Sequence, residues 1–488
     1  MASKLFVEKV RNYVNGSWVE STGKDAVELT NPATGERLGS CPVGTAADVD
    51  AAVQAAKAAF PAWSETPAPG RARHHVDLRH QMEQHFEELA SICTQEHGKT
   101  LDESRGDVRR GIDNVECGAG IPSMMMGQAL EQISGGIDCV AQRQPMGVFA
   151  AIAPYNFPSM VPFWFLPYCI ATGNTMVIKP SEQVPFSQHR IAQLIAELKL
   201  PKGVVNYVNG GREVVNGILE HKDIKGVSFV GSSPVAQHVY ETGTKHGKRV
   251  QALGGAKNFI VVMDDCDWDK SIPNLVESCY GCAGQRCLAG STVIAVGGAY
   301  SKVRDKLLEG ARAVKVGYGL EPGVTMGPVI SKSHKEKVLG LIEAGIKDGA
   351  KLALDGRSVS VPNHPNGHWV GPTLFDEVNP SMTIAQQEIF GPVMCVLRAG
   401  TLDEALATIQ AHPLANASSI YTSSGKSARE FVRRVPAAMV GVNIGVAAPM
   451  AFFTFGGAKG SMFGDLKAHG RDSIAFYTDS KTAITRWW

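Results

Sequence analysis

Between residues 147 and 255 the chain alternates short apolar runs with helix-like stretches, and this alternation restricts the fold more than any other feature of the sequence. Each apolar run is continuous, which is typical of strands that are covered on both faces of a sheet. Strand-like runs separated by helix-like stretches predict a parallel sheet between two layers of helices. The runs are GVFAAIAP, NTMVIKP, VVNYVNG, IKGVSFVG and RVQALGG. We therefore predict a doubly wound, dinucleotide-type domain of about five strands.

A second series of apolar runs begins near residue 253 and predicts a second α/β domain. Its strand-like runs are NFIVVMDD, STVIAVGG, PVMCVLRAG, SSIYTSSG and AMVGVNIG. The clearest helices of this half cover 301–314 and 333–349, and both end near glycine. Upstream, residues 46–63 and 73–99 have the apolar spacing of amphipathic helices that pack on the first domain.

The C-terminal segment 473–488 alternates apolar and polar residues and predicts an edge strand. It ends in Trp487 and Trp488, and exposed tryptophans at a sheet edge promote association. We therefore expect the end of the chain to form a contact between subunits.

Composition argues against two classes of function. The chain of 488 residues has a net charge of +1, so it lacks the basic footprint of a nucleic-acid-binding protein. The uncharged stretch between Arg143 and Lys179 is long enough for a membrane span, but it is interrupted by Pro154, Pro158, Pro162 and Pro167. Because prolines free backbone groups that a bilayer cannot satisfy, we expect a buried segment of a soluble enzyme. Ten cysteines without a signal peptide favour free thiols and a cytoplasmic protein.

Three of the cysteines lie in CYGCAGQRCLAG, residues 279–290, and either hold a metal or supply a nucleophile. A structural zinc site needs four ligands, and no second ligand pair follows. Cys279 and Cys282 fall on the apolar-spaced helix SIPNLVESCYGCAG and are typical of core thiols. Cys287 follows Arg286 in a glycine-rich turn, where a cation and backbone amides lower a thiol pKa. Cys287 is the candidate nucleophile, with an inert buried thiol as the alternative.

Two segments predict a nucleotide site. FVGSSPVA leads from a strand into a helix, with Gly231 at the turn and Ser232 at the N-cap, and a helix N-terminus suits a pyrophosphate. Ala236 replaces the second glycine of the usual fingerprint, so a plain strand-to-helix turn is the alternative. In VIKPSE, Lys179 and Glu182 follow the carboxyl end of a strand and are candidates to hold ribose hydroxyls. A surface salt bridge is the alternative for this pair.

Two further loops carry candidate groups. Asn156 in PYNFP is an uncharged donor at a strand end and is suited to stabilise an oxyanion, unless it bonds its own backbone in a turn. Glu388 and Phe390 in EIFGPV are candidates for a ribose ligand and a ring wall. The alternative for EIFGPV is a loop that closes the interface between the domains.

PYNFP, VIKPSE, FVGS, GQRC and EIFGPV occur in the order and spacing of the aldehyde dehydrogenase superfamily, which the chain resembles over nearly its whole length. The resemblance implies an NAD-dependent enzyme in which Cys287 is the nucleophile and Asn156, with the Cys287 N–H, forms the oxyanion hole. It also implies a set of cofactor-binding residues: Ala153, Tyr155, Lys179, Glu182, Gln183, Gly231, Ser232, Gly254, Glu388 and Phe390.

The same resemblance implies an α/β fold with three parts. A Rossmann-type NAD domain is expected over 1–122 and 147–252, and an α/β catalytic domain over 253–470. A small β extension for oligomerisation is expected over 123–146 and 471–488.

The residue at position 252 indicates a subclass. Hydrolytic members of the superfamily carry a water-activating glutamate where this chain has Ala252, and its absence leaves room for a thiol as acyl acceptor. VQALGGAKN, QRCLA and VNIGVAAPMAFFTF resemble the CoA-acylating methylmalonate-semialdehyde dehydrogenase family. That resemblance implies that Arg110 and Arg286 hold the substrate carboxylate with their forked guanidinium groups. Three positions depart from the residues usual in that family: Ala236, Gly254 and Leu288.

The expected reaction is the NAD- and CoA-dependent oxidative decarboxylation of methylmalonate or malonate semialdehyde to propionyl-CoA or acetyl-CoA, as in valine catabolism. We expect a homotetramer, as a dimer of dimers, with no metal, nucleic acid or membrane. A hydrolytic NAD(P)-dependent semialdehyde dehydrogenase, for example for succinate semialdehyde, is the alternative, followed by a non-catalytic nucleotide-binding scaffold. Glu182 favours NAD because its charge opposes a 2′-phosphate. Arg109 and Arg110 point about 100° apart on a helix, so we expect Arg109 to be solvated.

Overall fold

The computed structural model describes residues 5–488, and its largest sheet contains all five predicted strands of the first series. These strands are parallel, in the order β9-β8-β7-β10-β11, and antiparallel strands β1, β2 and β21 extend the sheet at its two edges. The bounds are Asn12–Val14 (β1), Ser17–Val19 (β2), Val148–Ile152 (β7), Thr175–Lys179 (β8), Val205–Tyr207 (β9), Ile224–Val230 (β10), Arg249–Leu253 (β11) and Met462–Phe463 (β21). The predicted doubly wound sheet is confirmed.

Both faces of this sheet are buried, which explains why its strands are apolar without alternation. In β7, Phe149 and Ala151 face one apolar cluster, whereas Val148, Ala150 and Ile152 face another. The first cluster includes side chains of α2, α3, α4 and α7, and the second includes side chains of α1, α8 and α9. These helices are Ala46–Glu65 (α1), Ala68–Gln84 (α2), Phe86–His97 (α3), Leu101–Met124 (α4), Phe186–Glu197 (α7), Arg212–Glu220 (α8) and Ser233–Lys245 (α9). The predicted segment 73–99 is divided between α2 and α3 at His85.

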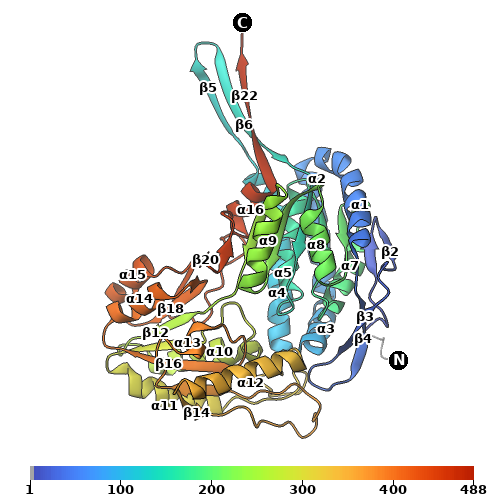
Figure 1. The fold of residues 1–488 in the computed structure, drawn as a ribbon. Helices are drawn as coiled ribbons and strands as arrows, with labels where there is room; N and C mark the ends of the chain where they lie inside the picture. The colour runs from blue at the N-terminus through green and yellow to red at the C-terminus, as the bar shows by residue number, and fades with distance from the viewer. Residues whose placement is uncertain (1–4) are drawn as a thin grey trace.

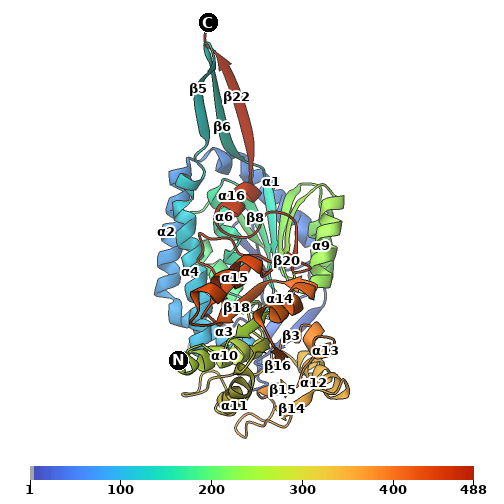
Figure 2. The same cartoon turned by 90° about the vertical axis from the view of Figure 1, so that its left-hand side faces the viewer.

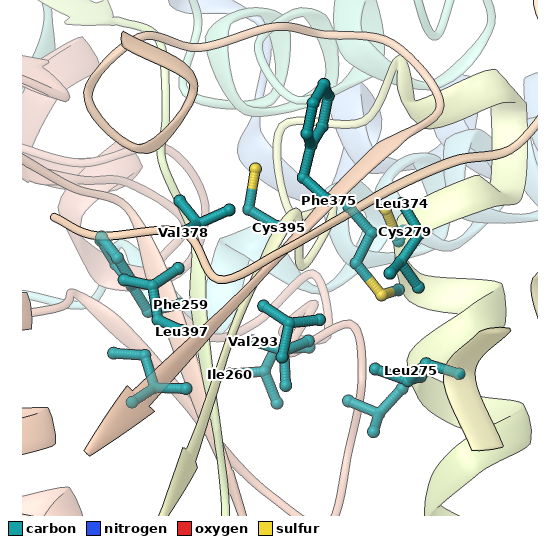
Figure 3. Close-up of a cluster of buried hydrophobic side chains, with 14 of the residues drawn as sticks. Phe259, Ile260, Leu275, Cys279, Val293, Leu374, Phe375, Val378, Cys395 and Leu397 are labelled. Atoms are coloured by element: carbon teal, nitrogen blue, oxygen red, sulfur yellow. The ribbon is translucent and has the colours of Figure 1, made fainter. Parts of the chain in front are cut away.

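A second sheet of seven strands has the order β14-β15-β16-β13-β12-β18-β19. Its strands are Phe259–Val262 (β12), Thr292–Val296 (β13), Lys351–Leu354 (β14), Thr373–Asp376 (β15), Val393–Ala399 (β16), Ala417–Tyr421 (β18) and Met439–Val442 (β19). The helices of this half are Trp268–Tyr280 (α10), Ala299–Arg312 (α11), Lys332–Lys347 (α12), Thr383–Gln386 (α13), Leu402–Ala411 (α14) and Gly425–Arg434 (α15). The five strands predicted here are confirmed, and the short strands β14 and β15 were missed. Figure 3 shows Cys279 in the apolar core of this half, as expected for a core thiol.

A three-stranded arm projects from the body of the molecule, and the C-terminus lies at its tip (Figures 1 and 2). It consists of Gln128–Ser134 (β5), Ile137–Pro145 (β6) and Thr478–Arg486 (β22), with β22 at one edge. The prediction of a strand from residue 473 is wrong over its first residues, because 473–477 complete helix α16 (Gly470–Tyr477), whose apolar side chains are buried against the body. Ile484 and Trp488 are exposed in the single chain, at 69% and 103%, and their role in a subunit contact stays a prediction.

The uncharged stretch between Arg143 and Lys179 forms part of β6, strands β7 and β8, and two short helices. Within residues 5–488 no helix is long and apolar enough to cross a membrane. The remaining elements are Ala26–Thr30 (β3), Arg37–Pro42 (β4), Met160–Phe163 (α5), Leu166–Ala171 (α6), Leu414–Ala415 (β17) and Ala458–Lys459 (β20). All ten cysteines are free thiols, as expected.

Candidate active site

Two cavities meet at Cys287, which is the one described residue that lines both. The first has a volume of about 410 Å³ and lies at the carboxyl ends of β7, β8, β10 and β11; it is called the sheet-end cavity. The second has a volume of about 670 Å³ and lies between α4, α10 and the loop 444–455; it is called the arginine cavity, after Arg110 and Arg286. The candidate nucleophile is thus accessible from two sides.

The turn that carries the nucleophile begins where α10 ends. Cys282 and Ala283 have left-handed backbone, with φ of 50° and 51°, and Gly284 follows with φ of 71°. A Cβ at Gly284 would lie 2.1 Å from the carbonyl oxygen of Gly391, so only glycine permits the close approach of these loops. The prediction that Cys282 lies on the helix is therefore wrong, because the helix ends at Tyr280 and the chain turns sharply.

The backbone of Cys287 is held by two asparagines. Its carbonyl oxygen accepts hydrogen bonds from the side chains of Asn258 and Asn416, at 2.9 and 2.8 Å. Burial raises the pKa of the Cys287 thiol to about 12, and the Glu388 carboxylate contributes to the increase. In the resting protein the thiol is therefore protonated at neutral pH.

Arg286 lowers the thiol pKa of its neighbour as predicted, but a low net pKa does not result. Arg286 does favour the thiolate of Cys287, but burial has the larger effect and the net shift is upward. The guanidinium is directed elsewhere, with Nε 3.3 Å from the Cys282 sulfur. Although Arg286 precedes Cys287 in the chain, its side chain therefore contacts Cys282.

The loop after β7 places Asn156 beside the nucleophile turn. Its Nδ2 donates to the carbonyl oxygen of Gln285 at 3.1 Å, so the asparagine does not cap its own turn. The backbone carbonyl oxygen of Asn156 accepts a hydrogen bond from Lys99 Nζ at 2.7 Å. Lys99 forms a fully buried ion pair with Asp107 at 3.0 Å, and Asp107 also accepts from the Met160 backbone N–H at 2.7 Å. This ion pair therefore connects the Asn156 backbone to the start of α5 at Met160.

The sheet-end cavity contains every residue of the predicted cofactor-binding set. Gly231 and the N-cap residue Ser232 immediately precede α9, and both line the cavity beside the N-terminus of that helix. Lys179 ends β8, and its Nζ donates to Glu182 at 2.9 Å and to the Gly210 carbonyl oxygen at 2.7 Å. The other predicted members that line the cavity are Ala153, Tyr155, Gln183, Gly254, Glu388 and Phe390.

The second half of the chain contributes the Glu388 loop to this cavity. Glu388 accepts a hydrogen bond from the Ala256 N–H at 2.9 Å, and burial raises its pKa. A Cβ at Gly255 would lie 2.4 Å from the Glu388 carboxylate, so the second of the paired glycines makes room for it. Buried Lys257 holds the loop by donating to the Ile384 and Gln387 carbonyl oxygens, at 2.6 and 3.1 Å.

The arginine cavity contains the two predicted carboxylate ligands. Arg110 contacts the Met450 sulfur at 3.0 Å and lies 3.9 Å from Asp113. Arg286 is largely buried and pairs with carboxylates of the protein. Arg109 points away from the cavity and forms an exposed ion pair with Glu83, as its helical position predicted.

Several functional candidates gave no sequence signal. Lys99 and Asp107 belong to no recognised motif, and Lys99 reaches Asn156 across 57 positions. His334 and Lys337 of α12 line the sheet-end cavity, and His334 Nε2 donates a hydrogen bond to the Phe390 carbonyl oxygen at 2.7 Å. Ala252, at the end of β11, is fully buried and lines neither cavity.

A family model for the aldehyde dehydrogenase family matches residues 18–483. The chain belongs to this family, and the resemblance inferred from the motifs is confirmed. It is 49% identical over 478 residues to malonate-semialdehyde dehydrogenase 2 of Geobacillus thermodenitrificans (strain NG80-2), covering 98% of this chain and 99% of that relative. It is 47% identical over 487 residues to malonate-semialdehyde dehydrogenase of Halalkalibacterium halodurans, covering all of both chains.

Solved structures agree with this assignment. The methylmalonate-semialdehyde dehydrogenase of Oceanimonas doudoroffii superimposes with a TM-score of 0.97 at 42% identity, covering 99% of both chains. A Sinorhizobium meliloti 1021 protein, described as a methylmalonate-semialdehyde dehydrogenase and complexed with NAD, has a TM-score of 0.96 at 42% identity, covering 98% of both chains. The predicted aldehyde-dehydrogenase-like fold is confirmed.

Proposed function

We propose that this protein is an NAD-dependent, CoA-acylating dehydrogenase of malonate or methylmalonate semialdehyde. The observation that carries the proposal is the position of Cys287 between the sheet-end cavity and the arginine cavity. A dehydrogenase of this kind needs its nucleophile between a hydride acceptor and an anionic aldehyde. The names of the full-length relatives support the same substrate class.

The residues of the sheet-end cavity fit NAD. The N-terminus of α9 offers free N–H groups and a partial positive charge for a pyrophosphate, and the Lys179–Glu182 pair offers a donor and an acceptor for a ribose. The Glu182 charge opposes the 2′-phosphate of NADP. NAD, when bound there, supplies the hydride acceptor.

The proposed chemistry begins at Cys287. Its sulfur attacks the aldehyde carbon after losing its proton, and the carbonyl oxygen becomes the oxyanion of a hemithioacetal. Asn156 Nδ2 and the Cys287 N–H are the donors proposed to stabilise that charge. Loss of a hydride from the former aldehyde carbon then gives a thioester of Cys287 with a carboxylate in the β position.

The same donors serve the second half of the reaction. The β-carboxylate leaves as CO2, and its bonding electrons form an enolate whose oxygen occupies the position of the earlier oxyanion. Protonation of the enolate carbon gives an acyl thioester. The CoA thiol attacks this thioester, Cys287 leaves as the thiolate, and the product is acetyl-CoA or propionyl-CoA. Ala252 carries no group that accepts a proton from water, so a thiol is the favoured acceptor.

The test is steady-state NADH formation from malonate semialdehyde with and without CoA. We expect turnover to require CoA and to be lost in Cys287→Ala. The matched control is Cys139→Ala, which removes another partly exposed thiol from the arm and keeps wild-type turnover. Sustained turnover without CoA would place the protein in the hydrolytic group, and an unchanged rate in Cys287→Ala would refute the assigned nucleophile. No turnover of any aldehyde would favour the binding scaffold.

A further inference from the structure

The charges that line the arginine cavity are mostly negative, although the proposed substrate is an anion. In the described part of the chain the lining contains five carboxylates and two guanidinium groups. Two of the acids pair with bases outside the lining, and Asp102 is in addition 90% exposed, so that water screens its charge. Asp102 pairs with Arg105 at 2.7 Å, and Asp107 pairs with Lys99 at 3.0 Å. These two acids therefore exert little field on a ligand in the cavity.

Three lining acids remain and outnumber the two arginines by one. The side chains of Glu103, Asp113 and Glu277 are 10%, 25% and 61% exposed. An anion that enters this cavity meets a net negative charge unless one carboxylate moves away. Glu277 is the best placed to do so, because it alone of the three lies mostly in water.

Glu277 occupies the guanidinium that the substrate carboxylate is expected to use. Its Oε1 lies 2.9 Å from Arg286 Nη2, and its backbone carbonyl oxygen accepts from Nη1 at 3.4 Å. Glu103 Oε1 is 3.4 Å from the same Nη2, and Nε donates to the Cys282 sulfur. Each nitrogen of Arg286 thus has a partner within the protein.

The two carboxylates on Arg286 differ in their freedom to leave. Glu103 also accepts hydrogen bonds from the backbone N–H groups of Cys282 and Thr100, so moving it would leave buried donors unpaired. Within residues 5–488 the Glu277 carboxylate accepts no such bond from a backbone N–H group, and its exposed side chain can rotate into solvent at little cost. The structure therefore contains one fixed counter-ion and one exchangeable counter-ion.

We propose that Glu277 is a specificity-determining residue: it occupies Arg286 in the empty enzyme and is displaced by the carboxylate of the semialdehyde. The proposal rests on the proposed function, since it assigns the competitor at that same substrate site. Neutral aldehydes have nothing to exchange with Glu277. Loss of CO2 removes the anion from the substrate, so Glu277 can return to Arg286 when the carboxylate has left. Glu277 thus weakens binding of the anionic substrate and favours clearance of the site afterwards.

The test is Glu277→Gln, which keeps the size of the side chain and removes its charge. We expect KM for malonate semialdehyde to fall about five-fold with kcat within about two-fold, because a partly exposed ion pair contributes up to about that factor. KM for propionaldehyde should stay within about two-fold. The matched control is Glu116→Gln, whose side chain is also 61% exposed and pairs with Arg79 outside the cavity; it should change neither KM.

A second measurement separates the inference from the proposed function. Malonate is used as a competitive inhibitor of propionaldehyde oxidation, and we expect its inhibition constant to fall about five-fold in Glu277→Gln. An unchanged or higher KM for the semialdehyde, with an unchanged inhibition constant, would overturn the exchange. Failure of the wild-type enzyme to oxidise the semialdehyde would refute the proposed function instead, and the malonate result would still decide whether Glu277 competes with an anion.

Discussion

Arg110→Leu provides a direct test of carboxylate recognition, because Arg110 retains donors for a ligand. Its nearest carboxylate, Asp113, is 3.9 Å away, and its other contact is the weakly accepting sulfur of Met450. A charge-assisted hydrogen bond contributes about 1.5–3 kcal/mol, so its loss should lower kcat/KM for malonate semialdehyde by about one to two decades. The side chain is 39% exposed, so the substitution should cost little stability.

The assay compares kcat/KM for malonate semialdehyde and propionaldehyde at saturating NAD and CoA. The loss should be confined to the carboxylated substrate, because propionaldehyde has no group for the guanidinium to bind. Arg109→Leu is the control, since Arg109 pairs with Glu83 outside the cavity and its loss should be nearly neutral for both aldehydes. Equal impairment of both aldehydes by Arg110→Leu would show that Arg110 has a structural role and would refute the reasoning.

Two further predictions concern the nucleophile and its support. Burial raises the pKa of Cys287 to about 12, and only the thiolate is alkylated. Labelling of Cys287 by iodoacetamide without ligands, followed by mass spectrometry, should therefore accelerate about tenfold per pH unit from pH 7 to 9. A labelling rate that reaches a plateau below pH 9 would contradict this expectation. Lys99→Met leaves Asp107 buried and unpaired, so we expect a loss of about 3–5 kcal/mol, seen as a lower thermal midpoint, together with a lower kcat. Adding Asp107→Leu should recover part of the stability, and a double variant no more stable than Lys99→Met would argue against the pair.

The sequence was a good guide to the two sheets, because burial on both faces leaves continuous apolar runs that stand out from the helices between them. It was a poor guide where an element is short or half exposed. Strands β14 and β15 have four residues each, too few for a periodic signal. Residues 473–477 alternate in polarity like a strand, yet Ile474, Phe476 and Tyr477 are buried against the body as part of a helix.

The candidate site was predictable to the extent that its residues lie at the ends of strands and in motifs. Except for Glu388 and Phe390, the cofactor-binding set follows β7, β8, β10 and β11, whose carboxyl ends meet at one edge of the sheet. The electrostatic partners were not predictable. Glu103 reaches Arg286 across 183 positions, and no local pattern marks that contact. For the same reason the direction of the Cys287 pKa was misjudged, since it depends on burial and on Glu388 from another loop.

The separation of the two cavities has a consequence for how variants should behave. Cys287 is the one described residue that lines both cavities, so the nucleophile turn lies between them. A substitution that changes a charge in the arginine cavity therefore alters no other residue that lines the sheet-end cavity. Substitutions at Arg110 and Glu277 should therefore change KM for the aldehyde and leave the dissociation constant of NAD unchanged. Lys99 lines neither cavity and donates a hydrogen bond to the Asn156 backbone carbonyl oxygen. Its loss should therefore lower kcat, with little effect on KM for the aldehyde or on the dissociation constant of NAD. The fold thus separates recognition of the carboxylate, binding of the dinucleotide and support of the oxyanion donor into groups of residues that can be altered independently.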